Sequence, residues 1–106
     1  MARAIINLPK SIRRGEVIEI KALVQHAMES GFRRTQTGEV IPRDIITRFA
    51  CAYNGREIFS AELYSAISAN PFIAFFTRAA DSGAIVCTWT GDNGFSITET
   101  VPITVG

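Results

Sequence analysis

Apolar side chains recur at every second position along most of the chain, and this period is typical of β-strands with one buried face. In segment 17–25, Ile18, Ile20, Ala22 and Val24 alternate with polar residues, while Leu23 is an apolar residue on the polar side. These segments predict strands whose apolar faces share one core. The same period predicts these further inward-facing residues: Ala4, Ile6, Leu8, Phe49, Cys51, Tyr53, Ile85, Cys87, Trp89, Phe95, Ile97, Val101, Ile103 and Val105.

Turn residues separate the apolar segments at fairly regular spacing. Asn54-Gly55 predicts a tight hairpin, and the sequence GDNG at 91–94 predicts another turn. Residues 61–71 have no clean period, which indicates a loop or a single helical turn. Pro102 cannot donate a ladder hydrogen bond, so we expect the last strand either at a sheet edge or bulged at this residue. About seven short strands without a helical pattern predict an all-β, immunoglobulin-like antiparallel β-sandwich, formed by one domain over residues 1–106.

The segment FIAFF at 72–76 is apolar on both faces. We assign Phe72, Ala74 and Phe76 to the core, which leaves Ile73 and Phe75 pointing outward. An outward apolar pair needs cover, either from a loop of this chain or from another chain. The segment therefore indicates a protein interface, with cover by the chain's own loop as the alternative.

A long polar insert occupies residues 25–44 and contains the single histidine, His26. Gly38 can supply the positive φ of a turn, so residues 32–42 predict a second hairpin that projects from the sandwich end. His26 has the parity of the apolar face, and we interpret it as a core-closing residue hydrogen-bonded to backbone. Charges in the insert nearly cancel, as in a solvated loop, but inserts of this length in compact domains are usually functional.

Composition limits the classes of partner. With a net charge of +1 and 20% charged residues, the chain has no basic field to attract nucleic acid or an anionic membrane. No apolar run reaches the length of a signal peptide or a membrane span. Taken alone, these features indicate a cytoplasmic protein that binds neither nucleic acid nor membrane.

Metal-binding and catalytic sites are not predicted. His26, Met28, Cys51 and Cys87 are copper-ligand types, but a blue-copper site needs two histidines and the chain contains one. The cysteines form no CxxC pair for zinc. The carboxylates lie at turns or on outward faces, without an acid or base partner at a suitable spacing. We expect no metal, no cofactor and no catalytic residues.

Cys51 and Cys87 both have inward parity, which predicts two packed core thiols of low reactivity. Their strands belong to one predicted sheet, whereas an antibody-type disulfide joins the two sheets, so we expect no such bridge. The alternative is a small thiol-dependent redox or sulfur-transfer protein that uses Cys51 or Cys87.

Four segments together resemble the SoxZ family, the Z subunit of the Sox sulfur-oxidation carrier complex. They are NLPKSIRRGEVIEIKALVQHAMESGFRR, IPRDIITRFACAYNGREIF, AISANPFIAFF and CTWTGDNG, which cover nearly the whole chain in order. Each motif is modest, but their combination and spacing are specific. Gly91 is a small departure from the family motif. In that motif we expect the turn after TWT to begin directly with the acidic residue, which in this chain is Asp92.

The resemblance implies a non-catalytic immunoglobulin-like subunit that forms a heterodimer with a Y subunit. In that family the Y subunit ends in a glycine-flanked cysteine, which carries the intermediates of thiosulfate oxidation between enzymes in the periplasm. It further implies transient contacts with other sulfur-oxidation enzymes and export together with the partner, which bears the signal. This chain has no glycine-flanked cysteine near Gly106, so the carrier thiol is expected on the partner.

Two groups of partner-binding residues are predicted on this basis. The insert contributes Met28, Phe32, Arg33 and Arg34, and the two-sided strand contributes Phe72, Ile73 and Phe75. A sandwich that associates with itself through the same strand is a third interpretation. It would give a homodimer when the chain is isolated.

Overall fold

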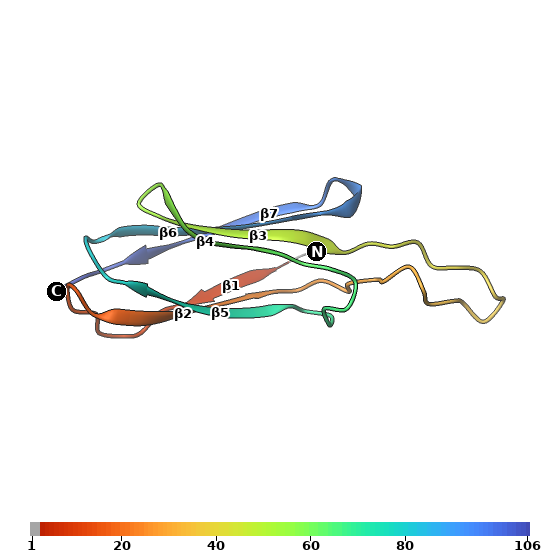
Figure 1. Ribbon diagram of the computed structural model, residues 1–106, viewed down its shortest axis with the longest axis horizontal. Helices are drawn as coiled ribbons and strands as arrows, with labels where there is room; N and C mark the ends of the chain where they lie inside the picture. Colours follow the sequence, from red (N-terminus) through yellow and green to blue (C-terminus); the bar gives the residue numbers. More distant parts are fainter. Residues whose placement is uncertain (1–2) are drawn as a thin grey trace.

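The computed structural model describes residues 3–106 as an antiparallel β-sandwich with no α-helix among them (Figure 1), which confirms the predicted all-β fold. No helix in this range is long and apolar enough to cross a lipid bilayer. The elements are β1 (Ala4–Asn7), β2 (Val17–Val24), β3 (Ile46–Tyr53), β4 (Arg56–Glu62), β5 (Phe72–Arg78), β6 (Gly83–Gly91), a 3-10 turn η1 (Asp92–Gly94) and β7 (Ser96–Ile103).

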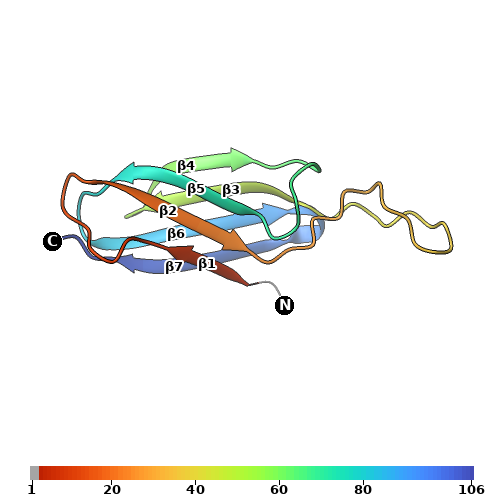
Figure 2. The same ribbon diagram turned by 90° about the horizontal axis from the view of Figure 1, so that it is seen from below.

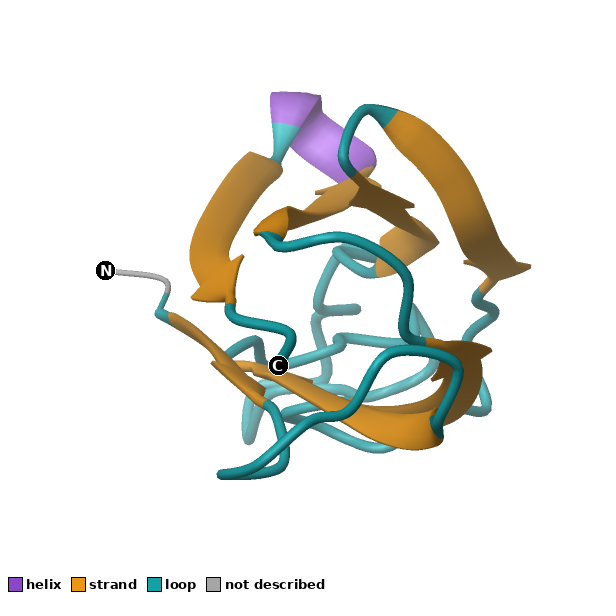
Figure 3. Cartoon of the chain, turned by 90° about the vertical axis from the view of Figure 1, so that its left-hand side faces the viewer, coloured by secondary structure: helices purple, strands orange, loops and turns teal. Residues whose placement is uncertain are grey.

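The strands form two layers. A three-stranded sheet has the order β1-β2-β5, and a four-stranded sheet has the order β4-β3-β6-β7. All neighbouring strands are antiparallel. The view along the strands shows the two sheets facing each other across the core (Figure 3). Each sheet therefore has one inner face for apolar side chains and one outer face.

The core contains most of the inward-facing residues that the two-residue period predicts. Others are only partly buried and pack against it, namely Leu8, Phe95, Ile97, Val101 and Val105. Ile18, Ile20, Ala22 and Val24 are all buried on β2. On the opposite sheet, β3 buries Phe49, Cys51 and Tyr53, and β6 buries Ile85, Cys87 and Trp89. Phe49 joins the sheets, because its ring lies 5.1 Å from Trp89 on β6 and 6.0 Å from Phe75 on β5, measured between ring centroids.

The hairpin, the edge strand and the loop that the sequence predicts are all present. Asn54 and Gly55 have φ values of 50° and 83°, as a two-residue hairpin between β3 and β4 requires. The last strand, β7, lies at the edge of the four-stranded sheet, which confirms the prediction from Pro102. Residues between β4 and β5 form a loop, also as predicted.

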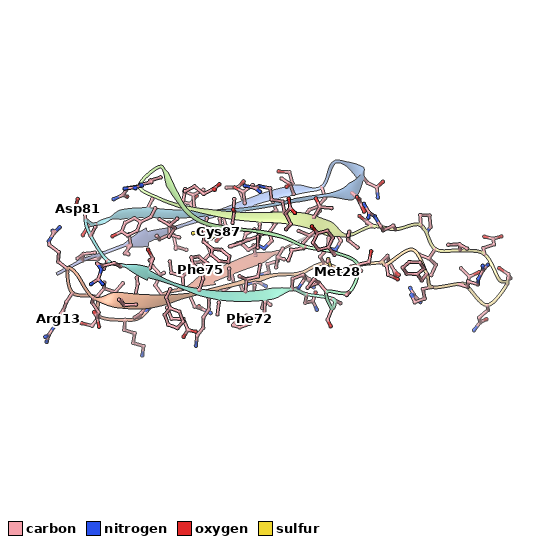
Figure 4. All side chains as sticks on the ribbon, in the orientation of Figure 1. Arg13, Met28, Phe72, Phe75, Asp81 and Cys87 are labelled. Atoms are coloured by element: carbon pink, nitrogen blue, oxygen red, sulfur yellow. The ribbon has the colours of Figure 1, made fainter. Side chains whose placement is uncertain are left out.

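The assignment of faces on β5 was wrong. Phe75 is 5% exposed, whereas Phe72 and Phe76 are 60% and 67% exposed. The register with β2 explains the difference, because it places Phe75 opposite the buried Ile20. There the Phe75 ring stacks on Phe59 at 4.5 Å. Figure 4 shows Phe75 between the sheets and Phe72 on the outer side.

Gly91, the last residue of β6, lies close to the backbone of Ile45 and Ile46, where β3 begins. A Cβ atom at this position would come within 2.4 Å of the Ile45 carbonyl oxygen and 2.8 Å of the Ile46 Cα atom. The backbone of Gly91 is extended, with φ −165°, so the missing side chain and not the backbone conformation is what this position requires. The departure from the family motif is thus compatible with a well-formed turn, in which the Gly91 N–H donates to the Phe95 carbonyl at 3.0 Å.

Gly91→Ala should lower the free energy of unfolding by about 1–3 kcal/mol, because backbone atoms cannot yield to the new methyl group as a flexible side chain can. Urea denaturation followed by Trp89 fluorescence measures the change. Ser96→Ala, at an exposed position of the neighbouring strand, is the control and should stay within about 0.5 kcal/mol of the wild type. Equal stability of Gly91→Ala and the wild type would contradict the close approach.

Candidate interaction surfaces

The three-stranded sheet carries an apolar surface on its outer side. The strand registers place Ile5 opposite Leu23 and Leu23 opposite Phe72, so these three side chains form a row across β1, β2 and β5. Val17 and Phe76 are exposed nearer the other end of the same sheet. We call these five residues the outer apolar face. Large apolar side chains gathered on one sheet are typical of a surface that another protein covers.

Two charged residues interrupt the outer apolar face. Glu19 and Lys21 lie between its two ends on β2, with 3.9 Å between their charged atoms. Beside the row of Ile5 and Leu23 is an open hollow of about 380 Å³. Its other lining residues are Arg3, Val24, Gln25 and Asn70. An apolar surface next to a polar hollow can accept a projecting side chain from a partner.

The sequence pattern indicated only part of this surface. Phe72 belongs to it, but Phe75 lies in the core and Ile73 is half-buried on the inner side of β5. Phe76 was assigned to the core and is exposed. One signal was present in the sequence, since Leu23 is the apolar residue that interrupts the alternation of β2 and it lies beside Phe72.

The insert forms an arm, residues 29–44, that projects from one end of the sandwich (Figure 2). Backbone hydrogen bonds link its two sides between Glu29 and Asp44. Further along the arm the Thr35 N–H donates to the Glu39 carbonyl at 2.8 Å and the Ile41 N–H to the Arg33 carbonyl at 2.9 Å, which pairs Arg34 with Val40. Gly38 has φ +89° at the turn. The predicted hairpin is therefore present, and it contributes to the 58 Å long axis of the molecule.

Hydrogen bonds fix the base of the arm. The His26 N–H donates to Asn70 Oδ1 at 3.0 Å, and the Asn70 N–H donates to the His26 carbonyl at 2.7 Å. The His26 Nδ1 atom accepts the Met28 N–H at 2.9 Å, and the ring packs edge-on against Phe95 at 4.8 Å. The side chain is nearly buried, which confirms His26 as a core-closing residue bound to backbone.

Met28 is part of this base and is not a surface residue. It is 6% exposed, and its Sδ atom accepts the Ile46 N–H at 3.3 Å. Its φ of 54° turns the chain into the arm. A contact between a partner and Met28 would therefore require the base to open, because Met28 is buried in the isolated chain.

The other predicted contact residues of the arm are exposed. Phe32 is 86% exposed, although it is a large apolar side chain. Arg33 binds Glu29 through two hydrogen bonds of 3.1 and 2.6 Å, and these lower the pKa of the Glu29 carboxyl. Arg34 donates to the Gly38 carbonyl at 2.8 Å. Both guanidinium groups thus brace the arm, and the exposed large apolar side chains of the arm are Phe32 and Val40.

Arg43 and Asp92 join the arm to the turn before β7. Two hydrogen bonds of 2.9 and 2.8 Å connect the guanidinium to the carboxylate, which also accepts the Ile45 N–H at 3.1 Å. The hydrogen bonds from Arg43 and then from Ile45 lower the pKa of the Asp92 carboxyl. This bidentate geometry is the strongest polar link between the arm and the sandwich.

Cys51 and Cys87 lie opposite each other on β3 and β6, in one sheet as predicted. Both are free and fully buried. Contact with the Cys51 sulfur, together with burial, raises the pKa of the Cys87 thiol. Within residues 3–106 no three side chains of the His, Cys, Asp or Glu types come together in a group that could hold a metal ion.

Sequence comparison decides the family. The profile described as "Sulphur oxidation protein SoxZ" matches residues 6–102, nearly the entire chain. The chain belongs to the SoxZ family. SoxZ proteins take part in sulfur oxidation, which agrees with the resemblance carried by the four sequence segments. No individual curated protein matches the chain in sequence.

Solved structures show the same fold in distant proteins. Superoxide reductase (neelaredoxin) from Ignicoccus hospitalis is 13% identical, with a TM-score of 0.74. The alignment covers 97% of this chain and 80% of that one. Structures of two sequence variants of the same reductase give the same TM-score and identity, with 79% of each covered. At this identity the likeness to superoxide reductase concerns the fold alone.

Asp92→Asn should reduce the acid sensitivity of the protein. Because the folded-state pKa of Asp92 is lowered, its carboxylate stabilises the fold above the unfolded pKa of about 3.9, and this contribution is lost as the pH falls through the lower folded pKa. Thermal unfolding between about pH 6 and 2 should therefore show a lower melting temperature for the variant near neutrality and a smaller decline below about pH 4.

Arg43→Gln provides the matched test of the same link. It should lower the melting temperature in the same pH range, and the double variant should lose less than the two single losses combined. Strict additivity of the two substitutions would show that Arg43 and Asp92 do not act together.

Proposed function

We propose that this SoxZ chain is a non-catalytic subunit of a sulfur-carrier heterodimer. Its partner is a Y subunit, whose C-terminal cysteine holds the intermediates of thiosulfate oxidation. The observation that carries the proposal is the outer apolar face, which gives a member of a sulfur-oxidation family a surface suited to a stable protein partner. The sulfur chemistry then takes place on the partner, and this chain presents and positions it.

The interior of the chain supports a non-catalytic role. A thiol that carries sulfur must reach its enzymes as a thiolate, whereas Cys51 and Cys87 are fully buried in the core. The carboxylates of Glu29 and Asp92 are occupied by Arg33 and Arg43. These contacts stabilise the arm, and they leave neither carboxylate free to act as a general base.

We assign the Y subunit to the outer apolar face. A stable interface covers about 800 Å² on each partner, roughly an eighth of the 6710 Å² of accessible surface on this chain. The outer side of a three-stranded sheet can supply an area of this size. Phe72 and Phe76 are four residues apart on the edge strand β5, so their side chains lie on the same outer face of the sheet. One partner can therefore contact both rings.

We assign the arm to the enzymes that visit the complex. Hydrogen bonds at His26, Met28 and Asp92 hold its base, so little conformational entropy is lost when another protein binds it. Phe32 offers one exposed aromatic side chain of the kind that anchors protein contacts. A small contact of this type suits short encounters better than a permanent interface.

The periplasm is the proposed site of action. The carrier complex of this family works there, and the Y subunit would supply the export signal for both chains. Phe72 and Phe76 are exposed in the isolated chain. If the two subunits are exported together, the partner covers these rings and they do not contact solvent during export.

The double substitution Phe72→Ser and Phe76→Ser should weaken binding of the Y subunit by at least about tenfold, because loss of a central aromatic anchor commonly costs about 2 kcal/mol or more. Titration calorimetry with the purified Y subunit measures the dissociation constant. Both rings are exposed, so the melting temperature of the isolated chain should change little.

Phe32→Ser is the matched control, since it removes an exposed phenylalanine that lies on the arm and outside the outer apolar face. It should leave Y-subunit affinity unchanged. If Phe32→Ser weakens the heterodimer and the double variant does not, the Y subunit binds the arm and our assignment is wrong. If the isolated chain forms a homodimer that the Y subunit cannot dissociate, self-association replaces the proposed heterodimer.

Thiol titration separates this function from a thiol-dependent redox or sulfur-transfer protein. An aromatic disulfide reagent should react with neither Cys51 nor Cys87 in the reduced native protein within minutes, because both thiols are buried, and with both after denaturation. A thiol that reacts rapidly in the native protein would support the transfer function instead.

A further inference from the structure

We propose that Cys51 and Cys87 are a dithiol–disulfide pair, which closes to a cross-strand disulfide between β3 and β6 when the chain folds under oxidising conditions. The proposal concerns the core of the sandwich. It is independent of the outer apolar face and of the Y subunit, so it can fail without affecting the proposed function.

The ladder between β3 and β6 places the two cysteines at a site of close approach. They are direct neighbours in the antiparallel register, two positions from the pair Phe49 and Trp89. The Asn54 N–H donates to the Ala84 carbonyl at 3.0 Å, which marks residues 54 and 84 as a hydrogen-bonded pair. Such pairs alternate with non-hydrogen-bonded pairs, and Cys51 with Cys87 falls on the second kind.

Non-hydrogen-bonded pairs have the shorter separation. Their Cα atoms lie about 4.5 Å apart, which is inside the range of about 4.4–6.8 Å that disulfides span. Both side chains are fully buried in the core, and the two residues are direct cross-strand partners on the same face of the sheet. Figure 4 shows Cys87 on the inner side of its sheet. Bond formation therefore needs rotation of the side chains and no large movement of the strands.

The reaction is a two-electron oxidation. Each thiol loses its proton, one S–S bond forms, and two electrons pass to the oxidant. A small-molecule or protein disulfide can act as that oxidant by thiol–disulfide exchange, and it is reduced to two thiols. One cysteine first forms a mixed disulfide with the oxidant, and the other then displaces the departing thiol.

Burial determines when this exchange can occur. Both cysteines are 0% exposed in the folded protein, so an oxidant reaches them only before β3 and β6 are covered by the other sheet or when the sandwich opens. A chain folded under reducing conditions keeps the two packed thiols. A chain folded under oxidising conditions gains a covalent link between the two central strands of the four-stranded sheet.

The test is oxidative refolding of the full-length chain. The protein is unfolded in urea with a reductant, exchanged into a buffer of oxidised and reduced glutathione, and refolded by dilution. Samples are quenched in acid, alkylated in denaturant and weighed by intact mass spectrometry. We expect a monomer that takes up no alkylating reagent and contains a peptide cross-linked through Cys51 and Cys87. Treatment with dithiothreitol before alkylation should restore two modified cysteines.

The single variants Cys51→Ala and Cys87→Ala are the matched controls. Each keeps one cysteine, so neither can form the internal bond, and each should end as a free thiol or a glutathione adduct. The proposal is overturned if the refolded wild type keeps two alkylatable thiols, carries glutathione on either cysteine as its main form, or is joined to a second chain. Binding of the Y subunit by the reduced protein tests the proposed function separately.

Discussion

Phe49 holds the two sheets of this protein together, and much of the remaining structure depends on its contacts. Its ring touches Trp89 within its own sheet and Phe75 on the opposite one. Phe59 closes the group by stacking on Phe75. Aromatic rings of this size contribute a large share of the apolar area that a small domain can bury. The cluster therefore sets the spacing of the sheets and selects which side of β5 faces inward.

The orientation of β5 has a direct consequence for function. In a strand with a two-residue period, placing Phe75 in the core forces Phe72 and Phe76 outward. The outer side of the three-stranded sheet then combines them with Ile5, Leu23 and Val17. The same packing that stabilises the core thus creates the surface that we assign to the partner. A core built on Phe72 and Phe76 would have left a different face for binding.

The arm is held by polar contacts, whereas the sandwich is held by its apolar core. Its two sides make few contacts with the sandwich, and its order comes from polar groups at its base, chiefly the His26 ring and the Asp92 carboxylate. These groups accept backbone N–H donors that would otherwise be unpaired in a partly buried region. Rigidity at the base together with an exposed phenylalanine is consistent with a binding element. The burial of both cysteines is consistent with the proposal that the sulfur chemistry takes place on a partner of this chain.

Much of this protein follows from its sequence alone. The two-residue period gives the strands and most inward residues, Asn54-Gly55 gives the hairpin, and the combined motifs give the family. Local patterns also place both cysteines in one sheet. Only the tertiary structure decides the facing of β5, because FIAFF is apolar on both sides and its register depends on the partner strand β2. The burial of Met28 was equally hidden from the sequence, since it results from the turn into the arm and a hydrogen bond with Ile46, which follows 18 positions later. Periodicity reports the residues of one strand, whereas these two outcomes depend on contacts between distant segments.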